Sequence, residues 1–121
     1  MRFMATVFVN DLKVDTIIGV CDWEKEVEQT LHFDIAMQVD ILAAAERDDL
    51  AATVNYAGVA EDVNTFTRAQ DCLLIETLLQ RLLVYLLNRY SMIESLTITL
   101  RKPMAIEAAE CAGITASLSR S

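Results

Sequence analysis

Four polar side chains lie at the ends of expected secondary-structure elements, where functional sites are usually built. Lys102 follows an alternating segment and precedes Pro103, and Glu24 lies in a charged connection between two such segments. Tyr56 stands at the start of one expected helix, and Glu76 lies in the first turns of another. A lysine, two carboxylates and a phenol are residue types that perform general acid–base chemistry.

Each of these side chains also has a simpler structural explanation. Glu24 could be a solvated turn residue and Lys102 a surface cation. Tyr56 could pack its ring while its hydroxyl stays in water, and Glu76 could be a first-turn carboxylate stabilised by the helix dipole. Because functional groups are a minority of polar residues, the pattern alone favours these explanations.

The single histidine narrows the chemistry. His32 lies on the polar face of an expected strand, where an exposed structural role is the simplest explanation. A zinc site with three histidines cannot form within one subunit, and no nucleophile elbow accompanies a serine or cysteine triad. The glycines at positions 19, 58 and 113 are isolated, so no phosphate-binding loop is present. We therefore expect no metal site.

The composition is that of an acidic chain rich in apolar residues. Its 121 residues are expected to form a single domain, 1–121. Apolar residues make up 54%, above the roughly 45–50% of soluble domains, so part of this surface is expected to be buried between subunits. The net charge of −8 makes nucleic acid and anionic membranes unfavourable partners.

Cysteine usage and apolar runs bear on the compartment. Cys21, Cys72 and Cys111 are widely spaced and odd in number, which is typical of reduced intracellular thiols, and we expect them to pack as small core residues. Residues 1–9 lack an apolar core long enough for a secretory signal. The stretch 73–87 contains three polar residues and is shorter than the about 20 residues of a membrane span. We expect a cytoplasmic protein.

Hydrophobic spacing predicts the elements that must position the four candidates. Apolar residues alternate with a period of two, which indicates strands, over residues 12–18, 31–39, 96–101 and 114–119. The spacing changes to 3.6 in a helix that begins near Ala57 and in a second from about Leu73 to Tyr90.

Local signals set the expected boundaries. Asn55 and Asp71 are the expected N-caps of the two helices, and Pro103 should end the third strand. Residues 41–55 are expected to be a loop with one helical turn. The order ββααββ predicts an α+β fold, a four-stranded antiparallel sheet with both helices on one face.

Several short motifs occur in order along the chain. They are Thr16-Ile17-Ile18-Gly19-Val20, Asp22-Trp23-Glu24, Glu28-Gln29, Asp48-Asp49-Leu50, Asn55-Tyr56-Ala57, Leu73-Leu74-Ile75-Glu76-Thr77 and Arg101-Lys102-Pro103. Each motif alone is weak, but in this order and spacing they resemble the bacterial dihydroneopterin aldolase family from about residue 7 to residue 118. Cys21 and Met104 depart from the pattern beside the expected site, which puts the selectivity for the substrate side chain in question.

The resemblance implies the tunnelling fold (T-fold), in which the sheets of several subunits join into a barrel. The family forms a tetramer or an octamer, with pterin sites between subunits. Glu76 would accept two hydrogen bonds from the pterin, and the backbone of Ile75 would contact it as well. Tyr56 of a neighbouring subunit would pack against the ring.

The implied reaction is a retro-aldol cleavage of 7,8-dihydroneopterin in folate biosynthesis, without metal, Schiff base or cofactor. Lys102 would carry protons through a bound water, Glu24 would position the side-chain hydroxyls or that water, and Tyr56 is a candidate for protonating the enamine. Three alternatives stay open: an epimerase acting on dihydroneopterin or its triphosphate, an oxygenase on the same substrate, and a non-catalytic ring-forming pterin-binding protein. The single histidine disfavours zinc enzymes of this fold.

Overall fold

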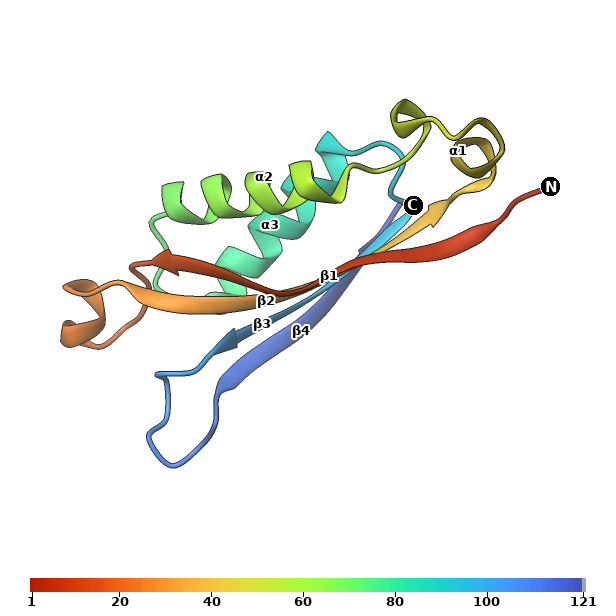
Figure 1. Ribbon diagram of the computed structural model, residues 1–121. Helices are drawn as coiled ribbons and strands as arrows, with labels where there is room; N and C mark the ends of the chain where they lie inside the picture. The colour runs from red at the N-terminus through yellow and green to blue at the C-terminus, as the bar shows by residue number, and fades with distance from the viewer. Residues whose placement is uncertain (121) are drawn as a thin grey trace.

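The computed structural model describes residues 1–120, which form one sheet with two long helices on one face (Figure 1). The strands are β1 (Met4–Thr16), β2 (Gln29–Asp40), β3 (Ser95–Lys102) and β4 (Ala112–Ser119). The helices are α1 (Leu42–Arg47), α2 (Tyr56–Ala69) and α3 (Ile75–Arg89), with short 3-10 helices η1 (Asp22–Lys25) and η2 (Leu50–Ala52). The sheet is antiparallel in the order β1-β2-β3-β4. The predicted ββααββ order and α+β class are confirmed.

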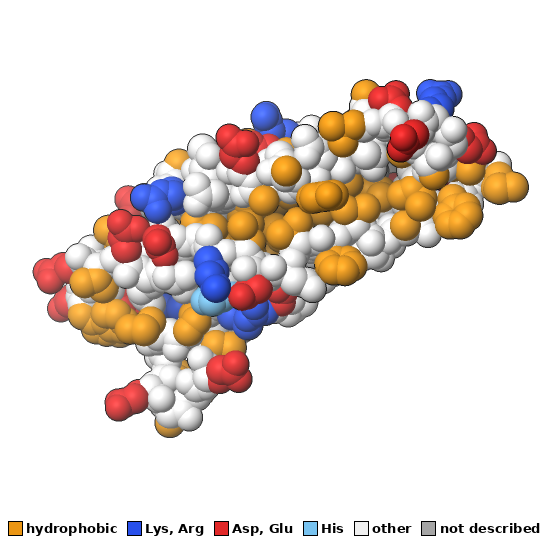
Figure 2. Space-filling model, viewed as in Figure 1, with side chains coloured by type: hydrophobic (Ala, Val, Ile, Leu, Met, Phe, Trp, Pro, Cys, Tyr) orange, Lys and Arg blue, Asp and Glu red, His pale blue; other side chains and the backbone are white. Residues whose placement is uncertain are grey.

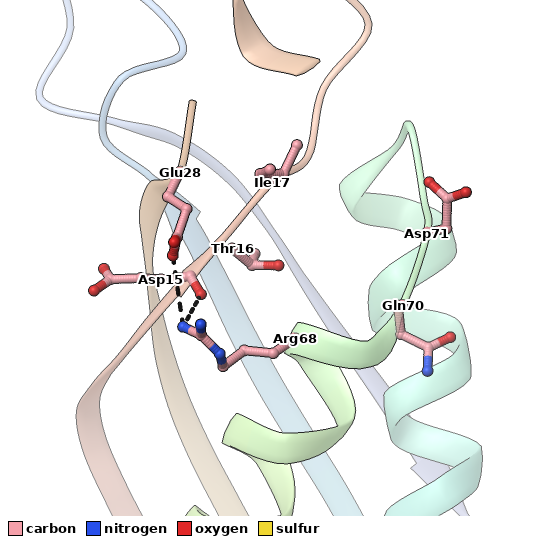
Figure 3. A pocket seen from close by; sticks show the side chains of 7 residues that line it. All are labelled: Asp15, Thr16, Ile17, Glu28, Arg68, Gln70 and Asp71. Atoms are coloured by element: carbon pink, nitrogen blue, oxygen red, sulfur yellow. Dashed lines mark hydrogen bonds and ion pairs between the residues drawn. The ribbon is translucent and has the colours of Figure 1, made fainter. Parts of the chain in front are cut away.

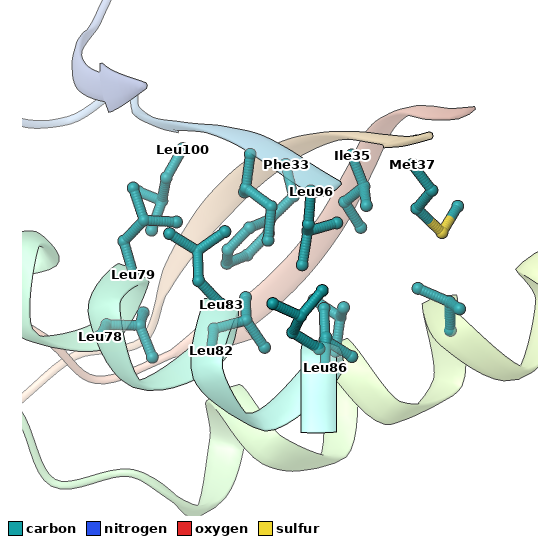
Figure 4. Close-up of a cluster of buried hydrophobic side chains, with 14 of the residues drawn as sticks. Phe33, Ile35, Met37, Leu78, Leu79, Leu82, Leu83, Leu86, Leu96 and Leu100 are labelled. Atoms are coloured by element: carbon teal, nitrogen blue, oxygen red, sulfur yellow. The ribbon is translucent and has the colours of Figure 1, made fainter. Parts of the chain in front are cut away.

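The core lies between the sheet and the two long helices. In β2, every second side chain from Leu31 to Val39 is buried, because successive side chains of a strand point to opposite faces. α3 contacts β3, β4 and α2, which explains why its apolar face is so wide. Figure 4 shows the resulting contact, where leucines of α3 face Phe33 and Ile35 of β2 and Leu96 and Leu100 of β3, and Met37 continues the buried row of β2.

A β-bulge in β1 keeps its apolar residues on the core side. The register with β2 shifts between Val9 and Leu12, and Asp11 adopts a positive φ of 55°. Its backbone N–H donates to Oδ1 of Asp34 at 2.8 Å. Before the bulge Val7 and Val9 face the core, and after it the even-numbered residues do, because one extra residue reverses the alternation.

Two expectations about the helical segments are wrong and one is confirmed. Asn55 caps α2, its Oδ1 accepting from the N–H groups of Ala57 and Gly58. Asp71 does not cap α3, because Leu74 precedes the helix and its apolar side chain accepts no hydrogen bond. The segment 41–55 holds more than one helical turn, since it forms both α1 and η2.

Some cysteines and apolar side chains lie outside the core. Cys72 is buried, but Cys111 is half-buried and Cys21 is exposed, so the expectation of three core cysteines is wrong. Figure 2 shows a continuous band of apolar side chains beside β1 and below α2, and Phe3, Met4 and Phe8 are exposed. None of the helices among residues 1–120 has the length and apolar character needed to cross a membrane.

Candidate active site

Glu24 and Lys102 meet at one end of the sheet. Glu24 belongs to η1 in the β1–β2 connection, where its backbone N–H donates to the Cys21 carbonyl at 3.0 Å. Lys102 is the last residue of β3, and the period of two places it on the same sheet face as the buried Leu100. The two side chains form an ion pair, with Lys102 only 12% and Glu24 only 6% exposed. The pair therefore closes the end of the core.

Glu24 is anionic in spite of its burial. Burial by itself raises the pKa of Glu24, because the carboxylate loses hydration. Hydrogen bonds from Lys102, Gln29 and the Cys21 backbone N–H, together with the charge of Lys102, outweigh this effect and lower the pKa from 4.5 to about 2. From the sequence pattern, the simpler explanation for Glu24 was a solvated turn residue. The burial of its side chain does not fit that explanation.

Two residues that lie against Glu24 were part of the sequence motifs but were given no role by sequence reasoning. Gln29, the first residue of β2, donates from Nε2 to Oε2 of Glu24 at 2.9 Å and to the Ile18 carbonyl at 3.0 Å. Gly19 has a φ of +145°, and a Cβ at this position would lie 2.5 Å from either carboxylate oxygen of Glu24. One signal was available, because Gln29 is a polar residue in phase with the buried residues of the predicted strand.

Glu76 lies in the first turn of α3 and lines an apolar cavity of about 250 Å³ between α3 and β4. Figure 4 shows Leu79 of α3 next to Leu100 of β3. Since Glu76 precedes Leu79 by one helical turn and Lys102 follows Leu100 on the same face, both polar residues lie at the same end of the α3–β3 contact. The residues lining the cavity are Glu76, Leu79, Gln80, Leu83, Val84, Ile114, Ala116, Ser117 and Leu118.

The start of α3 offers backbone donors beside Glu76. Ile75 is the first helical residue and its side chain packs partly against the core. Because the first N–H groups of a helix have no partner within the helix and Leu74 supplies no side-chain cap, they can donate to an acceptor on a ligand.

Tyr56 lies away from this cluster within the chain. It is the first residue of α2 and is 60% exposed. The other end of α2 lies beside the end of β1, where Arg68 donates to the Asp15 carbonyl at 2.7 Å and pairs with Glu28 (Figure 3). A helix of 14 residues spans about 20 Å, so the start of α2, where Tyr56 lies, is far from the β1–β2 connection that holds Glu24 (Figure 1). The chain thus brings Glu24 and Lys102 together but not Tyr56.

A second polar cluster lies on the sheet face away from the long helices. His32 is not a free surface residue, because its side chain is 22% exposed and its Nδ1 lies 2.5 Å from Oδ1 of Asp11. Arg101 forms ion pairs with Asp34 and, at 3.1 Å, with Asp11. In the part of the chain that the structure describes, no group of three or more His, Cys, Asp or Glu side chains is arranged to hold a metal ion.

Comparison of the sequence with known proteins gives one consistent result. The dihydroneopterin aldolase family matches residues 7–117. A dihydroneopterin aldolase from Haemophilus influenzae is 37% identical over 111 residues, covering 92% of this chain and 93% of that protein. The dihydroneopterin aldolase of Escherichia coli K12 is 38% identical over 111 residues, covering 92% of this chain and 90% of that protein.

The structural comparisons agree. The structure of Escherichia coli dihydroneopterin aldolase in complex with neopterin superposes with a TM-score of 0.90 at 36% identity, covering 95% of this chain and 99% of that one. A uricase from Bacillus fastidious, 10% identical with a TM-score of 0.68, aligns with 97% of this chain and 48% of its own and shares the fold alone. The expected T-fold of the single subunit is confirmed, and the chain belongs to the dihydroneopterin aldolase family.

Proposed function

We propose that Glu24 and Lys102 are the acid–base centre of a dihydroneopterin aldolase that converts 7,8-dihydroneopterin into 6-hydroxymethyl-7,8-dihydropterin and glycolaldehyde. Family membership assigns the class of reaction, a carbon–carbon bond cleavage in folate biosynthesis. The assignment of residues rests on the buried ion pair between Lys102 and Glu24. A buried pair adds little net stability to a fold, and strongly perturbed ionisable groups gather at functional sites.

The reaction breaks the bond between the first two carbons of the substrate side chain. The hydroxyl on the second carbon loses its proton and becomes the aldehyde of glycolaldehyde. The electron pair of the broken bond moves into the pterin ring, where protonated N5 accepts it. The first carbon of the resulting enamine is then protonated and becomes the hydroxymethyl group, and N5 releases its proton, so the cleavage needs no oxidant, reductant or net proton.

Lys102 and Glu24 divide the proton transfer in this proposal. Lys102 exchanges protons with the reacting hydroxyl through a bound water. Glu24, held anionic with a pKa of about 2, orients that water or the substrate hydroxyls and stabilises Lys102 as a cation. Acid–base catalysis of this kind contributes about 10²–10⁴-fold to a rate.

Glu76 and the backbone of Ile75 hold the heterocycle. A carboxylate fits the two adjacent N–H donors at one edge of a pterin, and bonds to an ionised acceptor are stronger than neutral ones. Support comes from the placement of Glu76 at a mainly apolar cavity, which suits a flat ring with one polar edge. The Escherichia coli relative was crystallised with neopterin.

Tyr56 reaches the site from a neighbouring subunit, and the assembly is a tetramer or an octamer. Tyr56 is exposed and too far from Glu24 to complete the site within its own chain. The two outer strands of the sheet, β1 and β4, have one unpaired side each among residues 1–120, which lets sheets of adjacent subunits join. The exposed apolar residues of β1 would be covered in such a ring.

The other functions are less well supported. An epimerase acting on the triphosphate needs several cations near the substrate side chain, but Asp34 and Asp11 hold Arg101 on the opposite sheet face. A non-catalytic pterin-binding protein has no need of a buried acid–base pair. An oxygenase differs only in the fate of the reactive intermediate, and product analysis separates it from an aldolase.

A cytoplasmic location fits the thiols of the chain. Cys21, Cys72 and Cys111 are all free. Free thiols persist in the reducing cytoplasm, whereas exported proteins of this size commonly carry disulfides. Neither nucleic acid nor membrane is part of the proposal.

Incubation of the purified protein with 7,8-dihydroneopterin tests the function. We expect glycolaldehyde and 6-hydroxymethyl-7,8-dihydropterin in equal amounts, and an assembly of four or eight subunits by light scattering. Chiral analysis of the recovered substrate measures any epimerisation at the second side-chain carbon. Turnover to an inverted substrate without glycolaldehyde would replace the aldolase by the epimerase, and no turnover at all would favour the binding protein.

A further inference from the structure

Gln29 is a buried polar residue whose hydrogen bonds are only partly satisfied. Its side chain is 3% exposed, and Oε1 is buried with no partner among residues 1–120. Both contacts of Nε2, the Glu24 carboxylate and the Ile18 carbonyl, are acceptors, which fixes the orientation of the amide. An unpartnered buried acceptor costs free energy that an apolar side chain would avoid, so core packing does not explain a glutamine here.

Gly19 makes room for the same carboxylate. A Cβ built on Gly19 would lie 2.3 Å from Cδ of Glu24, closer than side chains approach one another. The φ of +145° is also one that residues with a side chain rarely adopt. The backbone at Gly19 therefore forms the wall against which the carboxylate rests.

The contacts of the carboxylate leave it one orientation. Oε2 accepts from both Gln29 and Lys102, and Oε1 accepts from the Cys21 N–H at 3.3 Å. Without Gln29, Lys102 and Cys21 would remain, but the flexible lysine would then be the only side chain fixing Oε2. A catalytic group gains from supports that keep its geometry while protons move, because misplacement of a reacting group by about 1 Å can cost about 10²-fold in rate.

We propose that Gln29 and Gly19 are positioning residues, which hold the carboxylate of Glu24 against Lys102 throughout the reaction. This inference rests on the proposed role of the Glu24–Lys102 pair. Gln29 touches neither the reacting atoms nor any of the cavities described above, and it acts through Glu24. Gly19 acts by the absence of a side chain.

The groups that face Glu24 define what a variant should change. The titratable ones are Lys102 from β3 and, within its own connection, Cys21, whose thiol is exposed. Gln29 from β2 is neutral and donates one hydrogen bond, which is among the causes of the lowered pKa of Glu24. Removal of that donor should raise the pKa of Glu24 without changing the net charge of the site.

The first experiment compares Gln29→Leu with Thr67→Val as a matched control. Thr67 is also buried, with an unpartnered Oγ1, but it lies in α2 and does not contact Glu24. For Gln29→Leu we expect kcat to fall about tenfold to a hundredfold with little change in KM, and the acid limb of the pH profile to move upward. For Thr67→Val we expect kcat and the acid limb to match those of the wild type. Equal kcat values and equal acid limbs for the two variants would overturn the proposal.

A second readout is independent of activity. A carbon-13 titration of the Glu24 carboxyl should show no protonation between about pH 3 and 6 in the wild type and in Thr67→Val, because that pKa is about 2. In Gln29→Leu the signal should titrate within that range, and an unchanged signal contradicts the positioning role. If the wild type fails to cleave dihydroneopterin while Gln29→Leu shifts the titration, the proposed function fails and the support of Glu24 stands.

Glycine variants test the same proposal from the other side of the carboxylate. Gly19→Ala should lower kcat by at least about tenfold, because the new methyl group must displace Glu24. Gly58→Ala is the control, since its Cβ would make only ordinary contacts, with the Tyr90 hydroxyl at 3.4 Å and the Asn55 side chain at 3.6 Å, and it should keep the wild-type kcat. Gln29→Met, which keeps an unbranched side chain, replaces Gln29→Leu if the leucine disturbs folding. A Gly19→Ala variant with wild-type kcat would contradict the proposed role of Gly19 in positioning the Glu24 carboxylate.

Discussion

Arg101 and Lys102 are neighbours on β3 that point to opposite faces of the sheet. Arg101 lies on the face away from the long helices, is 30% exposed, and pairs with two aspartates, Asp34 and Asp11, of which Asp11 is 51% exposed. Lys102 lies on the core face and pairs with one carboxylate, Glu24, at 12% and 6% exposure. Adjacent residues of the same charge thus form ion pairs in very different surroundings.

The two ion pairs differ in burial rather than in pairing, and burial is the reason that we propose a catalytic role for only one of them. Water screens the pairs of Arg101, and exposed pairs of this kind contribute about 0–1 kcal/mol to stability. Water is largely excluded from the Lys102–Glu24 pair, so that both charges lose hydration and depend on each other and on their hydrogen bonds. The buried pair is therefore expected to matter for catalysis, and the exposed cluster for local structure around the β1 bulge.

Replacement of Lys102 should have the largest effect. For Lys102→Ala we expect kcat to fall by about 10²–10⁴-fold with a small change in KM, because the proton carrier is lost while the pterin contacts remain. Steady-state assays of glycolaldehyde release measure both. The matched Arg101→Ala should keep a kcat within about twofold of the wild type, and similar losses in the two variants would remove the functional distinction between the two faces.

Acid should destabilise the protein through Glu24. Its pKa is about 2 in the folded chain against 4.5 in the unfolded one, so its contribution to stability is fully present above about pH 4.5 and is lost as the pH falls towards 2. The shift corresponds to about 3 kcal/mol at most. Urea unfolding at a series of pH values checks this.

The control for this acid effect is Glu24→Gln, which should flatten the dependence between pH 4.5 and 3. Asp34→Asn on the exposed face should alter it less: Arg101 lowers the pKa of Asp34, but solvent screens that pair. A larger effect from Asp34→Asn would reverse the ranking of the two clusters.

Glu76 is the carboxylate to which we assign substrate binding rather than proton transfer. Glu76→Ala should raise KM and the Kd for the pterin product by about 10–100-fold, the value of one or two charge-assisted hydrogen bonds, with a smaller change in kcat. Fluorescence titration with 6-hydroxymethyl-7,8-dihydropterin gives the Kd directly. If Glu76→Ala and Lys102→Ala lower kcat and raise KM in the same proportions, the proposed division between anchoring and proton transfer is wrong.

The smallest effect is expected for the exposed pairs. Arg101→Ala should lower the free energy of unfolding by less than about 1 kcal/mol, and salt should reduce that difference further. Urea unfolding at low and high ionic strength measures it. A loss that is larger and independent of salt would show that the cluster around Asp11 holds the bulge more firmly than its exposure suggests.

Most of the fold was predictable because the signals are local. Alternation from Leu31 to Val39 and from Leu96 to Leu100 indicated strands, and Asn55 indicated a helix start; all three are confirmed. Asp71 was misjudged because a capping residue type is common in loops as well, and α3 begins after Leu74. The bulge at Asp11 was missed because Phe8 continues the even-numbered alternation of the residues after it, yet lies exposed.

The candidate site was predictable in its residue types but not in its contacts. The motifs around Glu24 and Lys102 suggested a pterin enzyme, whereas the pattern alone favoured a surface role for both. Only the structure brings them together, because their ion pair joins the β1–β2 connection to the end of β3. The sequence showed that Gln29 is a polar residue in phase with the buried residues of β2, but it did not show that its partner is Glu24.

The sequence by itself determined the order of the elements, which side of β2, β3 and β4 faces the core, and the family. These depend on backbone geometry and on the spacing of apolar residues, which are properties of neighbouring positions. The tertiary structure alone decided that the Lys102 side chain is 12% exposed and the Arg101 side chain 30% exposed, and that Gln29 and Gly19 enclose Glu24. Desolvation and hydrogen bonding depend on the atoms that folding brings around a group, and those atoms come from distant parts of the chain.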